Sequence, residues 1–467
     1  MGLAEEVAPP EAQAGLFGDA LPPPPKAEEG LSIYVHFEDF SDLAPFARLL
    51  GQPVTSQTRW LRFPPDDVGV PARPIEDEAE FDDSKATQGG LFGDAEWWEE
   101  YWAGMPEFDQ RDLAPRHTIQ VDFKSPAGVE ALSKLLAQRI PGDVRRTPSI
   151  WYPEAEIGRF ADKRYISRTP LGPKHPVYIV SKGRWETRLT SRALHRLGVE
   201  HFIVVEAQER DRYAAMIDPS ATLLVLDPKY QVDYDACDDL GMTKGKGPGP
   251  ARNFAWDHSV DSLGASWHWV MDDNIDGFFR LTKNLKTPVA DGTIFRAMED
   301  FCERYSNVGM AGPNYFMFAS RKTKMPPLVF NTRIYSCNLI RNDVPYRWRG
   351  RYNEDTDISL RMLKDGLVTV QFNAFLQLKQ TTQTMTGGNT AEFYAKEGTR
   401  PKSEMQVKLH PDVSRIVWKW GRYHHYVDYK PFRRNRPALR PGAEILTGVN
   451  NYGMELFIDA PSGEIAA

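Results

Sequence analysis

Three side chains that suit a hard cation follow a short apolar run in the middle of the sequence. Residues 266–271 read as a buried strand, and Asp272, Asp273 and Asn274 come directly after it, with Asp276 just beyond. Oxygen ligands of this kind suit Mg²⁺ or Mn²⁺, which usually share their coordination with substrate phosphates. A simple turn is the alternative interpretation, because Asp and Asn also favour turns through local hydrogen bonds.

A Gly/Pro-rich loop and a helix must position this strand. The loop spans residues 245–250, and Ala251, Arg252 and Asn253 open the helix. In open α/β sheets, ligands bind beyond the carboxyl ends of the strands, which is where the acidic triplet is expected. The order of loop, helix, strand and triplet resembles the nucleotide-sugar domain of GT-A glycosyltransferases, which favours a binding site over a turn.

That resemblance assigns roles to these residues. It implies that Arg252 and Asn253 face the diphosphate of a UDP-sugar donor. It also implies that the triplet binds ribose and a divalent cation, Mn²⁺ or Mg²⁺, with Asp272 contacting the donor. Many members of the family carry Asp at the third position, where this chain has Asn274. The direct metal ligand among Asp272, Asp273 and Asn274 therefore stays open.

Strands and helices alternate before the triplet. Apolar runs within 176–184, 201–206 and 221–227 read as buried strands, and helical segments separate them. Alternation at this spacing predicts a parallel, doubly wound α/β sheet. Loops at the ends of the first two strands would then face a nucleotide, unless they are ordinary solvated turns. The residues expected to contact the donor there are Ser181, Lys182, Gly183, Arg184 and Glu206.

A second acidic motif opens a helix further along the chain. Residues 352–357 read Tyr-Asn-Glu-Asp-Thr-Asp, and the helix is expected over 358–364. Asp357 suits a helix cap, because acidic side chains stabilise the first turn. The Glu354–Asp355 pair resembles the second acidic motif of inverting GT-A enzymes. The resemblance implies that Asp355 is the catalytic base for an acceptor hydroxyl and that Glu354 helps to hold the acceptor or the metal.

Charge is distributed unevenly along the chain. The net charge of −7 combines −14 over residues 1–165 with +7 over the remainder, and residues 400–440 hold 11 Lys/Arg against 3 Asp/Glu. A basic half on an acidic protein points to a local polyanionic partner. Aromatic residues lie among these basic ones, as in a nucleic-acid groove, although composition alone favours a surface-packing segment. The expected acceptor contacts are Arg347, Arg349, Arg351, Lys430, Arg433, Arg434 and Arg436.

A histidine near the C-terminus is the remaining metal candidate. Such a residue binds the metal in many GT-A enzymes, and the resemblance implies His424 or His425 for this role, with His424 preferred and His410 as the rival.

Composition narrows the class of protein. With 41% hydrophobic and 26% charged residues over 467 positions, the chain fits a globular protein of two or three domains. No apolar run approaches the ~20 residues of a membrane span, and the N-terminus does not resemble a secretory signal. Cys237, Cys302 and Cys337 are far apart in the sequence and suggest no disulfide framework, so we expect a reducing cytoplasm.

The N-terminal third contains an internal repeat. Residues 31–37, 41–50 and 58–63 are echoed by 117–123, 128–138 and 149–153. Each copy predicts strand, helix, strand, and two copies would form a four-stranded antiparallel sheet with both helices on one face, a ferredoxin-like α+β domain. For this N-terminal domain, a role in packing or oligomerisation is favoured over a catalytic role. Trp97, Trp98, Tyr101 and Trp102 read as a docking helix rather than a base-stacking platform, because nearby Glu residues would repel phosphates.

These features give a domain plan. We expect a disordered arm at 1–30, an accessory domain at 31–165 with an acidic linker at 66–117, a glycosyltransferase domain at 166–445 with a basic DNA-binding segment, and a tail at 446–467.

Residues 176–437 together resemble the TET-associated glycosyltransferases of tailed bacteriophages. The shared motifs are VYIVSKGR, ARN, MDDN, NEDTDISLRMLKDG and GRYHHYVDY. The resemblance implies sugar transfer to 5-hydroxymethylcytosine in phage DNA, in the cytoplasm of an infected bacterium and alongside other phage DNA-modification enzymes. Two alternatives remain: a glycosyltransferase with a protein or glycan acceptor, and a nucleic-acid-binding protein with an inactive transferase fold.

Overall fold

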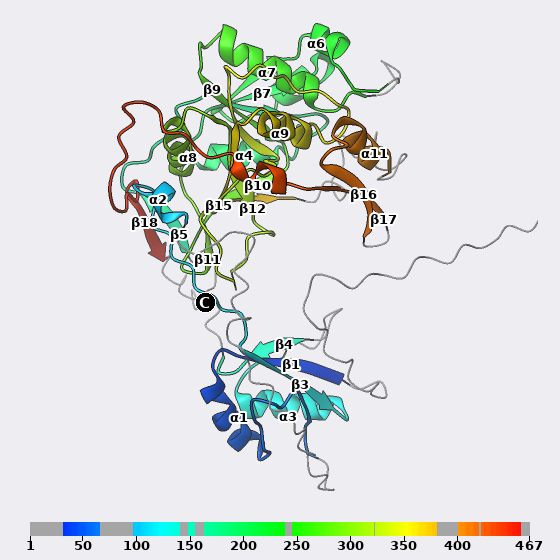
Figure 1. The fold of residues 1–467 in the computed structure, drawn as a ribbon, viewed down its shortest axis with the longest axis vertical. Coiled ribbons are helices and arrows are strands. Elements are labelled where there is room, and N and C mark those ends of the chain that lie inside the picture. The colour runs from blue at the N-terminus through cyan, green and yellow to red at the C-terminus, as the bar shows by residue number, and fades with distance from the viewer. Residues whose placement is uncertain are drawn as a thin grey trace, which may run out of the picture. The chain divides into compact units, whose positions relative to one another are not determined.

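The structure, a computed structural model, consists of two compact units (Figure 1). The first comprises Met1–Glu78 and Ala114–Glu156, and the second comprises Ala79–Leu113 and Ile157–Ala467. The described residues are 31–65, 97–140, 148–154, 163–238, 245–321, 323–380, 400–419 and 422–458. The expected arm at 1–30 lies outside them. No helix in the described part is long and apolar enough to cross a membrane.

The smaller unit is a four-stranded sheet with two helices. Its elements are β1 (Leu31–Phe37), η1 (Phe40–Asp42), α1 (Leu43–Leu50), β2 (Trp60–Arg62), β3 (His117–Phe123), α3 (Pro126–Leu136) and β4 (Ser149–Trp151). The strand order is β2-β3-β1-β4. Only the central pair, β1 with β3, is antiparallel, whereas β2–β3 and β1–β4 are parallel. The expectation of an all-antiparallel sheet is therefore wrong.

Each repeat depends on the other for its pairing. The second strand of each copy pairs with the first strand of the other copy, so neither copy forms a sheet alone. The inward alternation is the same in both: Ile33 and Val35 lie opposite Val121 and Ile119, and all four are buried. Alternation fixes which residues face the core but not the direction of pairing, which explains why the repeat did not predict the mixed sheet.

The larger unit is built on a ten-stranded mixed sheet. Its main path runs β11-β10-β15-β12-β14-β9-β6-β7-β8, and β13 pairs with β15. The parallel, doubly wound half is β6 (Val177–Val180), β7 (His201–Val205), β8 (Ala221–Val225) and β9 (Trp267–Asp272). The other strands are β10 (Ile275–Thr282), β11 (Leu285–Pro288), β12 (Val308–Tyr315), β13 (Leu328–Phe330), β14 (Cys337–Arg341) and β15 (Val368–Lys379). The α/β class expected from the alternating pattern is confirmed, but the sheet is mixed rather than parallel throughout, because β10, β11 and β14 pair antiparallel with their neighbours.

Helices pack on both faces of this sheet because its strands are apolar on both sides. On β6, Val177 and Ile179 face one core, while Tyr178 and Val180 face another. The first core includes α4 (Leu189–Arg196), α5 (Arg210–Ala214) and α8 (Thr293–Glu303). The second includes α7 (Gly249–Asp261) and α9 (Glu354–Lys364). The short elements η3 (Ala207–Glu209) and α6 (Pro228–Asp233) lie between strands in the sequence.

Three further segments belong to the larger unit. Helix α2 (Glu99–Trp102) buries Trp102 in the main core, with Trp97, Trp98 and Tyr101 packed against it, so the predicted docking helix is confirmed. Strands β5 (Lys163–Ser167) and β18 (Met454–Ile458) pair with each other, which places residues expected in the accessory domain and the tail in one two-stranded sheet. The C-terminal elements are α11 (Arg400–Leu409), β16 (Ser414–Lys419), β17 (Arg422–Val427) and η7 (Lys430–Arg434).

Candidate active site

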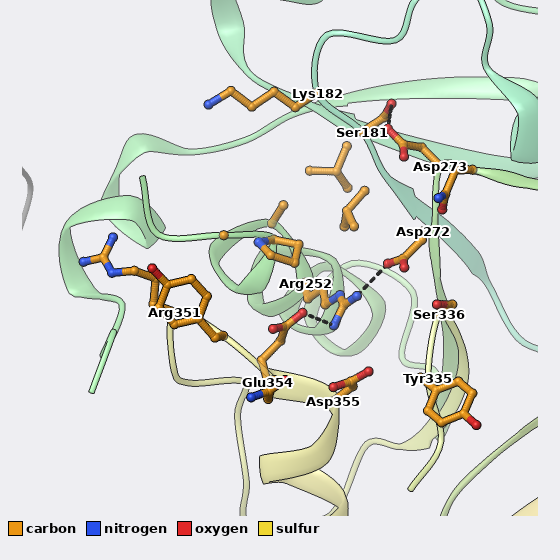
Figure 2. A pocket seen from close by; sticks show the side chains of 18 of the residues that line it. Ser181, Lys182, Arg252, Asp272, Asp273, Tyr335, Ser336, Arg351, Glu354 and Asp355 are labelled. Carbon is orange, nitrogen blue, oxygen red and sulfur yellow. Dashed lines mark hydrogen bonds and ion pairs between the residues drawn. The ribbon is translucent and has the colours of Figure 1, made fainter. Parts of the chain in front are cut away.

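A pocket of about 410 Å³ lies beyond the carboxyl ends of β6, β7 and β9. The connectivity reverses between β6 and β9, because β6 pairs with β7 on one side and with β9 on the other. Such a reversal is where ligands bind in doubly wound sheets. Figure 2 shows side chains from both acidic motifs directed into this space.

The loop after β6 forms one wall and is held by Asp273. Ser181 Oγ donates to Asp273 Oδ2 at 2.7 Å, and buried Arg184 forms an ion pair with the same carboxylate. Burial raises the pKa of Asp273, and Arg184 partly offsets this effect. Gly183 N donates to Glu209 at 3.0 Å, outside the pocket lining. Asp273 lines the pocket, and its carboxylate anchors the loop after β6.

Arg252 joins the two acidic motifs. Its guanidinium donates to Asp272 Oδ1 at 2.7 Å and to Glu354 Oε1 at 3.0 Å, as the dashed lines in Figure 2 show. The side chain is only 3% exposed, and its charge lies 4.5 Å from the centre of the Trp348 ring. Asn253 exchanges two hydrogen bonds with the Trp348 backbone and does not line the pocket. The expected donor contact from Asn253 is therefore not found; this residue positions the Trp348 segment.

Asp272 is also paired with Lys379 from the end of β15. Lys379 Nζ donates to Asp272 Oδ2 at 2.6 Å and to Ser336 Oγ at 2.7 Å. Burial by itself would raise the pKa of the Asp272 carboxyl. The neighbouring cations Lys379 and Arg252 outweigh this effect and hold the pKa well below its usual range. The same carboxylate raises the pKa of Lys379 despite its burial. Both oxygens of Asp272 therefore face protein cations.

The second acidic motif lies in the first turn of α9. Glu354 and Asp355 are its first two residues, so the helix begins four residues earlier than the sequence suggested. Asp355 Oδ1 accepts from Thr356 N at 2.7 Å, and no described residue donates to Oδ2. Burial raises the pKa of Glu354, and Arg252 only partly offsets it. Asp355 lines the pocket and retains an acceptor oxygen for a substrate hydroxyl.

The comparison with known families now identifies the part of the chain that carries the pocket. Residues 175–388 match the family model described as TET-Associated Glycosyltransferase. This segment belongs to the TET-associated glycosyltransferase family. A search of curated proteins found no match.

The match contains most of the residues that build the pocket of this glycosyltransferase. Arg252, Asp272, Glu354, Asp355 and Lys379 all fall inside it. The C-terminal elements α11, β16 and β17 fall outside it, although Lys402 and His425 line the same pocket.

The triplet expected to bind a divalent cation, Asp272, Asp273 and Asn274, lines the pocket. The described residues contain no group of three or more His, Cys, Asp or Glu side chains that could hold a metal. Asp273 pairs with Arg184, both oxygens of Asp272 are paired with cations, and the Asn274 amide donates to Gln380 O at 3.0 Å. The carboxylates of Asp272 and Asp273 are thus engaged by protein cations, and the amide oxygen of Asn274 alone does not supply the oxygen ligands that Mn²⁺ or Mg²⁺ requires, so the residues present do not fit the ion.

The histidine assignment changes as well. His425 lines the pocket, whereas His424, its neighbour on β17, does not. Successive side chains of a strand point to opposite faces, so only one of His424 and His425 can face the pocket. Burial, followed by nearby Lys402 and Arg333, lowers the pKa of His425 to about 4. His410 Nε2 lies 2.9 Å from the buried Asp357 carboxylate and is structural.

Three arginines expected to bind the acceptor have structural partners instead. Arg347 pairs with Asp257, and Arg349 pairs with Asp357. Neither lines the pocket. Arg351 lines the pocket but is fully buried against Asp238 and the carbonyl of Gly245, so it holds the Gly-rich loop. Asp357, bound by Arg349, Arg361 and His410, organises the start of α9.

The basic C-terminal residues lie on the surface. Phe432 is buried and anchors η7, and four exposed basic residues surround it: Lys430, Arg433, Arg434 and Arg436. The β16–β17 hairpin exposes Trp418 (62%) and Tyr423, whose rings contact each other at 4.8 Å. Trp420, another aromatic residue of the basic 400–440 segment, lies outside the described residues.

Several pocket residues carry no sequence motif. They are Tyr315, Arg333, Tyr335, Ser336, Lys379 and Lys402. Lys379 ends a long apolar run at 368–379, which is the same pattern that located Asp272. A polar residue at the end of a buried strand is therefore the signal that could have found it.

Proposed function

We propose that this protein transfers a sugar from a UDP-sugar to the hydroxymethyl group of 5-hydroxymethylcytosine in DNA, with inversion at the anomeric carbon. The observation that carries the proposal is the pocket itself: loops after β6 and β7, the start of α7, the end of β9 and the first turn of α9 all contribute to it. Its family membership and its doubly wound half support a GT-A-type transferase domain.

The donor half of the pocket has groups suited to a nucleotide. Ser181, Lys182 and Glu206 line the side formed by β6 and β7, and Lys182 Nζ lies 3.3 Å from Glu206. We assign uridine and ribose to this side. Gly247 and Pro248 line the pocket just before α7, and Arg252 follows on the first turn. The diphosphate is assigned to this helix start, because helix N-termini and arginine favour anions.

Asp355 is the proposed catalytic base. Its Oδ2 accepts the proton of the acceptor hydroxyl as the hydroxyl oxygen attacks the anomeric carbon. The bond between that carbon and the diphosphate oxygen breaks on the opposite face, and UDP leaves with the bonding electrons. Glu354, held by Arg252 at 3.0 Å, has a positioning role in this scheme.

DNA as the acceptor is supported by the surface beside the pocket. Strand β17 carries His425, which lines the pocket, and also the exposed Tyr423 and Tyr426. Arg415 lies 4.6 Å from the Tyr426 ring and Arg400 lies 5.6 Å from the Tyr423 ring. Aromatic faces with cationic neighbours suit an unstacked base next to phosphates. A hydroxylating enzyme of the TET type must act first on the same DNA. We place the reaction in the cytoplasm of a phage-infected bacterium.

The test is product analysis with matched acceptors. The protein is incubated with DNA containing cytosine, 5-methylcytosine or 5-hydroxymethylcytosine and with a panel of nucleotide sugars, and nucleoside masses are measured after digestion. We expect a hexose mass on 5-hydroxymethylcytosine alone. UDP-sugar hydrolysis without DNA product would favour a protein or glycan acceptor, and absence of both would favour an inactive transferase fold.

A further inference from the structure

Lys379 has the geometry of a built-in cation in the pocket. It reaches the carboxylate of Asp272 from β15, an element that contains neither acidic motif. Its ammonium group has three N–H donors, and two of them are directed at Asp272 and Ser336. The side chain is 18% exposed and lines the pocket, with its ammonium group 5.9 Å from the centre of the Tyr315 ring.

More positive charge lies nearby on segments without a recognised motif. Arg333 and Lys402 line the same pocket, and both lie close enough to His425 to lower its pKa. The Arg333 guanidinium lies 4.8 Å from the centre of the Tyr335 ring, which fixes its plane. Described residues therefore supply a fixed set of cations where the sequence led us to expect a divalent ion.

We propose that Lys379 neutralises the diphosphate of the donor, so that this site binds a nucleoside diphosphate and releases it without a divalent metal. The inference rests on the proposed function and replaces the expected Mn²⁺ or Mg²⁺. Asp272 and Ser336 orient the ammonium group. As the bond from the anomeric carbon to the diphosphate oxygen breaks, the electron pair stays on that oxygen. A fixed cation stabilises this developing charge without reorganisation.

The experiment is UDP binding by titration calorimetry in EDTA, repeated with Mn²⁺, with UMP as the second probe. Wild type, Lys379→Met, Lys379→Arg and Lys364→Met are compared. Lys364 is the matched control because it pairs with Asp412 outside the pocket. We expect wild type to bind UDP in EDTA with little gain from Mn²⁺. Lys379→Met should bind UDP about tenfold or more weakly, the range for removal of a charged hydrogen bond, with a smaller effect on UMP.

The remaining outcomes separate this inference from the proposed function. Lys379→Arg keeps the charge and should stay within a few-fold of wild type, as should Lys364→Met. Wild-type binding of UDP only when Mn²⁺ is present overturns the inference and leaves the transferase proposal standing. Unchanged UDP affinity in a folded Lys379→Met variant also overturns it. No UDP binding by wild type under either condition defeats both proposals.

Discussion

Asp273 shows how one residue of a metal-like triplet can have a structural role. Its carboxylate is buried against Arg184 and Ser181, while Asp272 faces the pocket cations. Both residues line the pocket, but Asp273 belongs to the turn that follows β9, where its carboxylate is directed at the loop after β6.

Asp273→Asn should therefore destabilise the fold even in EDTA. The substitution leaves the Arg184 charge buried without its partner, which costs ~3–5 kcal/mol in the free energy of unfolding. Chemical denaturation measures it. Asp276→Asn is the control, because its carboxylate makes only an exposed contact with Gln380, and it should change stability by less than ~0.5 kcal/mol. Equal stability of the two variants would contradict the anchoring role.

Sequence reasoning found the acidic residues of the site because they stand at the ends of periodic elements. Asp272 follows a buried strand and Asp355 opens a helix, so pattern and chemistry coincide there. Lys379 was not found, and His425 was not preferred over His424, because the positions of these side chains depend on which strands pair and in what register. That information is non-local, and no motif carries it.

At the scale of elements, the β16–β17 hairpin carries the proposed DNA contacts. Trp418→Ala should weaken binding of DNA by ~1–3 kcal/mol, the value for one base stacked on an aromatic ring. Fluorescence anisotropy at constant salt measures this, with UDP affinity as the internal control. If the variant binds DNA as tightly as wild type, the β16–β17 hairpin is not part of the acceptor site.

The exposed arginines beside Phe432 test the electrostatic part of the same interface. Replacing Arg433, Arg434 and Arg436 with Ala should flatten the slope of log affinity against log salt by ~0.7–0.9 for each phosphate that the variant no longer neutralises. Affinity is measured at several salt concentrations for wild type and the triple variant. If the triple variant binds DNA with an unchanged slope, these three arginines do not contact the phosphates, and the phosphate-binding groove must lie elsewhere on the surface.

Strand β9 makes stability depend on pH through His268. Burial lowers its pKa to about 4, below the ordinary value of 6.5, so the unfolded state binds a proton first as pH falls. The stability is complete above about pH 6.5 and is lost progressively toward pH 4, by up to ~1.4 kcal/mol per pH unit. His268→Phe should show a shallower fall of the free energy of unfolding over this window. Parallel curves for both proteins would contradict the assignment, whatever their absolute stabilities.

The helices and strands that the sequence predicted correctly are those whose type is determined by the hydrophobic pattern alone. The strands of the doubly wound half are continuous apolar runs, and the predicted spans contain β6, β7, β8 and β9 almost entirely. The β10–β11 hairpin was missed because Asp273 and Asn274, which form the turn between β9 and β10, were interpreted as part of a binding site. In the smaller unit the repeat predicted every strand and helix, but the parallel pairing of β2 and β4 depends on contacts between the copies.

At the scale of the whole molecule, the two units have separate cores. The core of the smaller unit contains Val35, Phe46 and Leu132, and shares no residue with the core beneath the ten-stranded sheet. Val35→Asp buries an unpaired charge and should unfold the smaller unit, because isolated buried charges are very costly. UDP affinity should remain within a few-fold of wild type. Limited proteolysis reports the unfolding, and loss of UDP binding would show that the pocket depends on the smaller unit.

The central claim is that Asp355 deprotonates the hydroxymethyl group of a DNA base. The most direct measurement is the rate of glucosyl or other hexosyl incorporation into 5-hydroxymethylcytosine DNA, by nucleoside mass, for wild type and Asp355→Asn at saturating UDP-sugar. The account predicts a hexose adduct with wild type and a ~10²–10⁴-fold slower reaction with the variant, at unchanged UDP affinity. Two results would contradict the role of Asp355 in this reaction. One is an Asp355→Asn variant that reacts as fast as wild type, and the other is DNA that carries no added hexose mass after incubation with the wild-type protein.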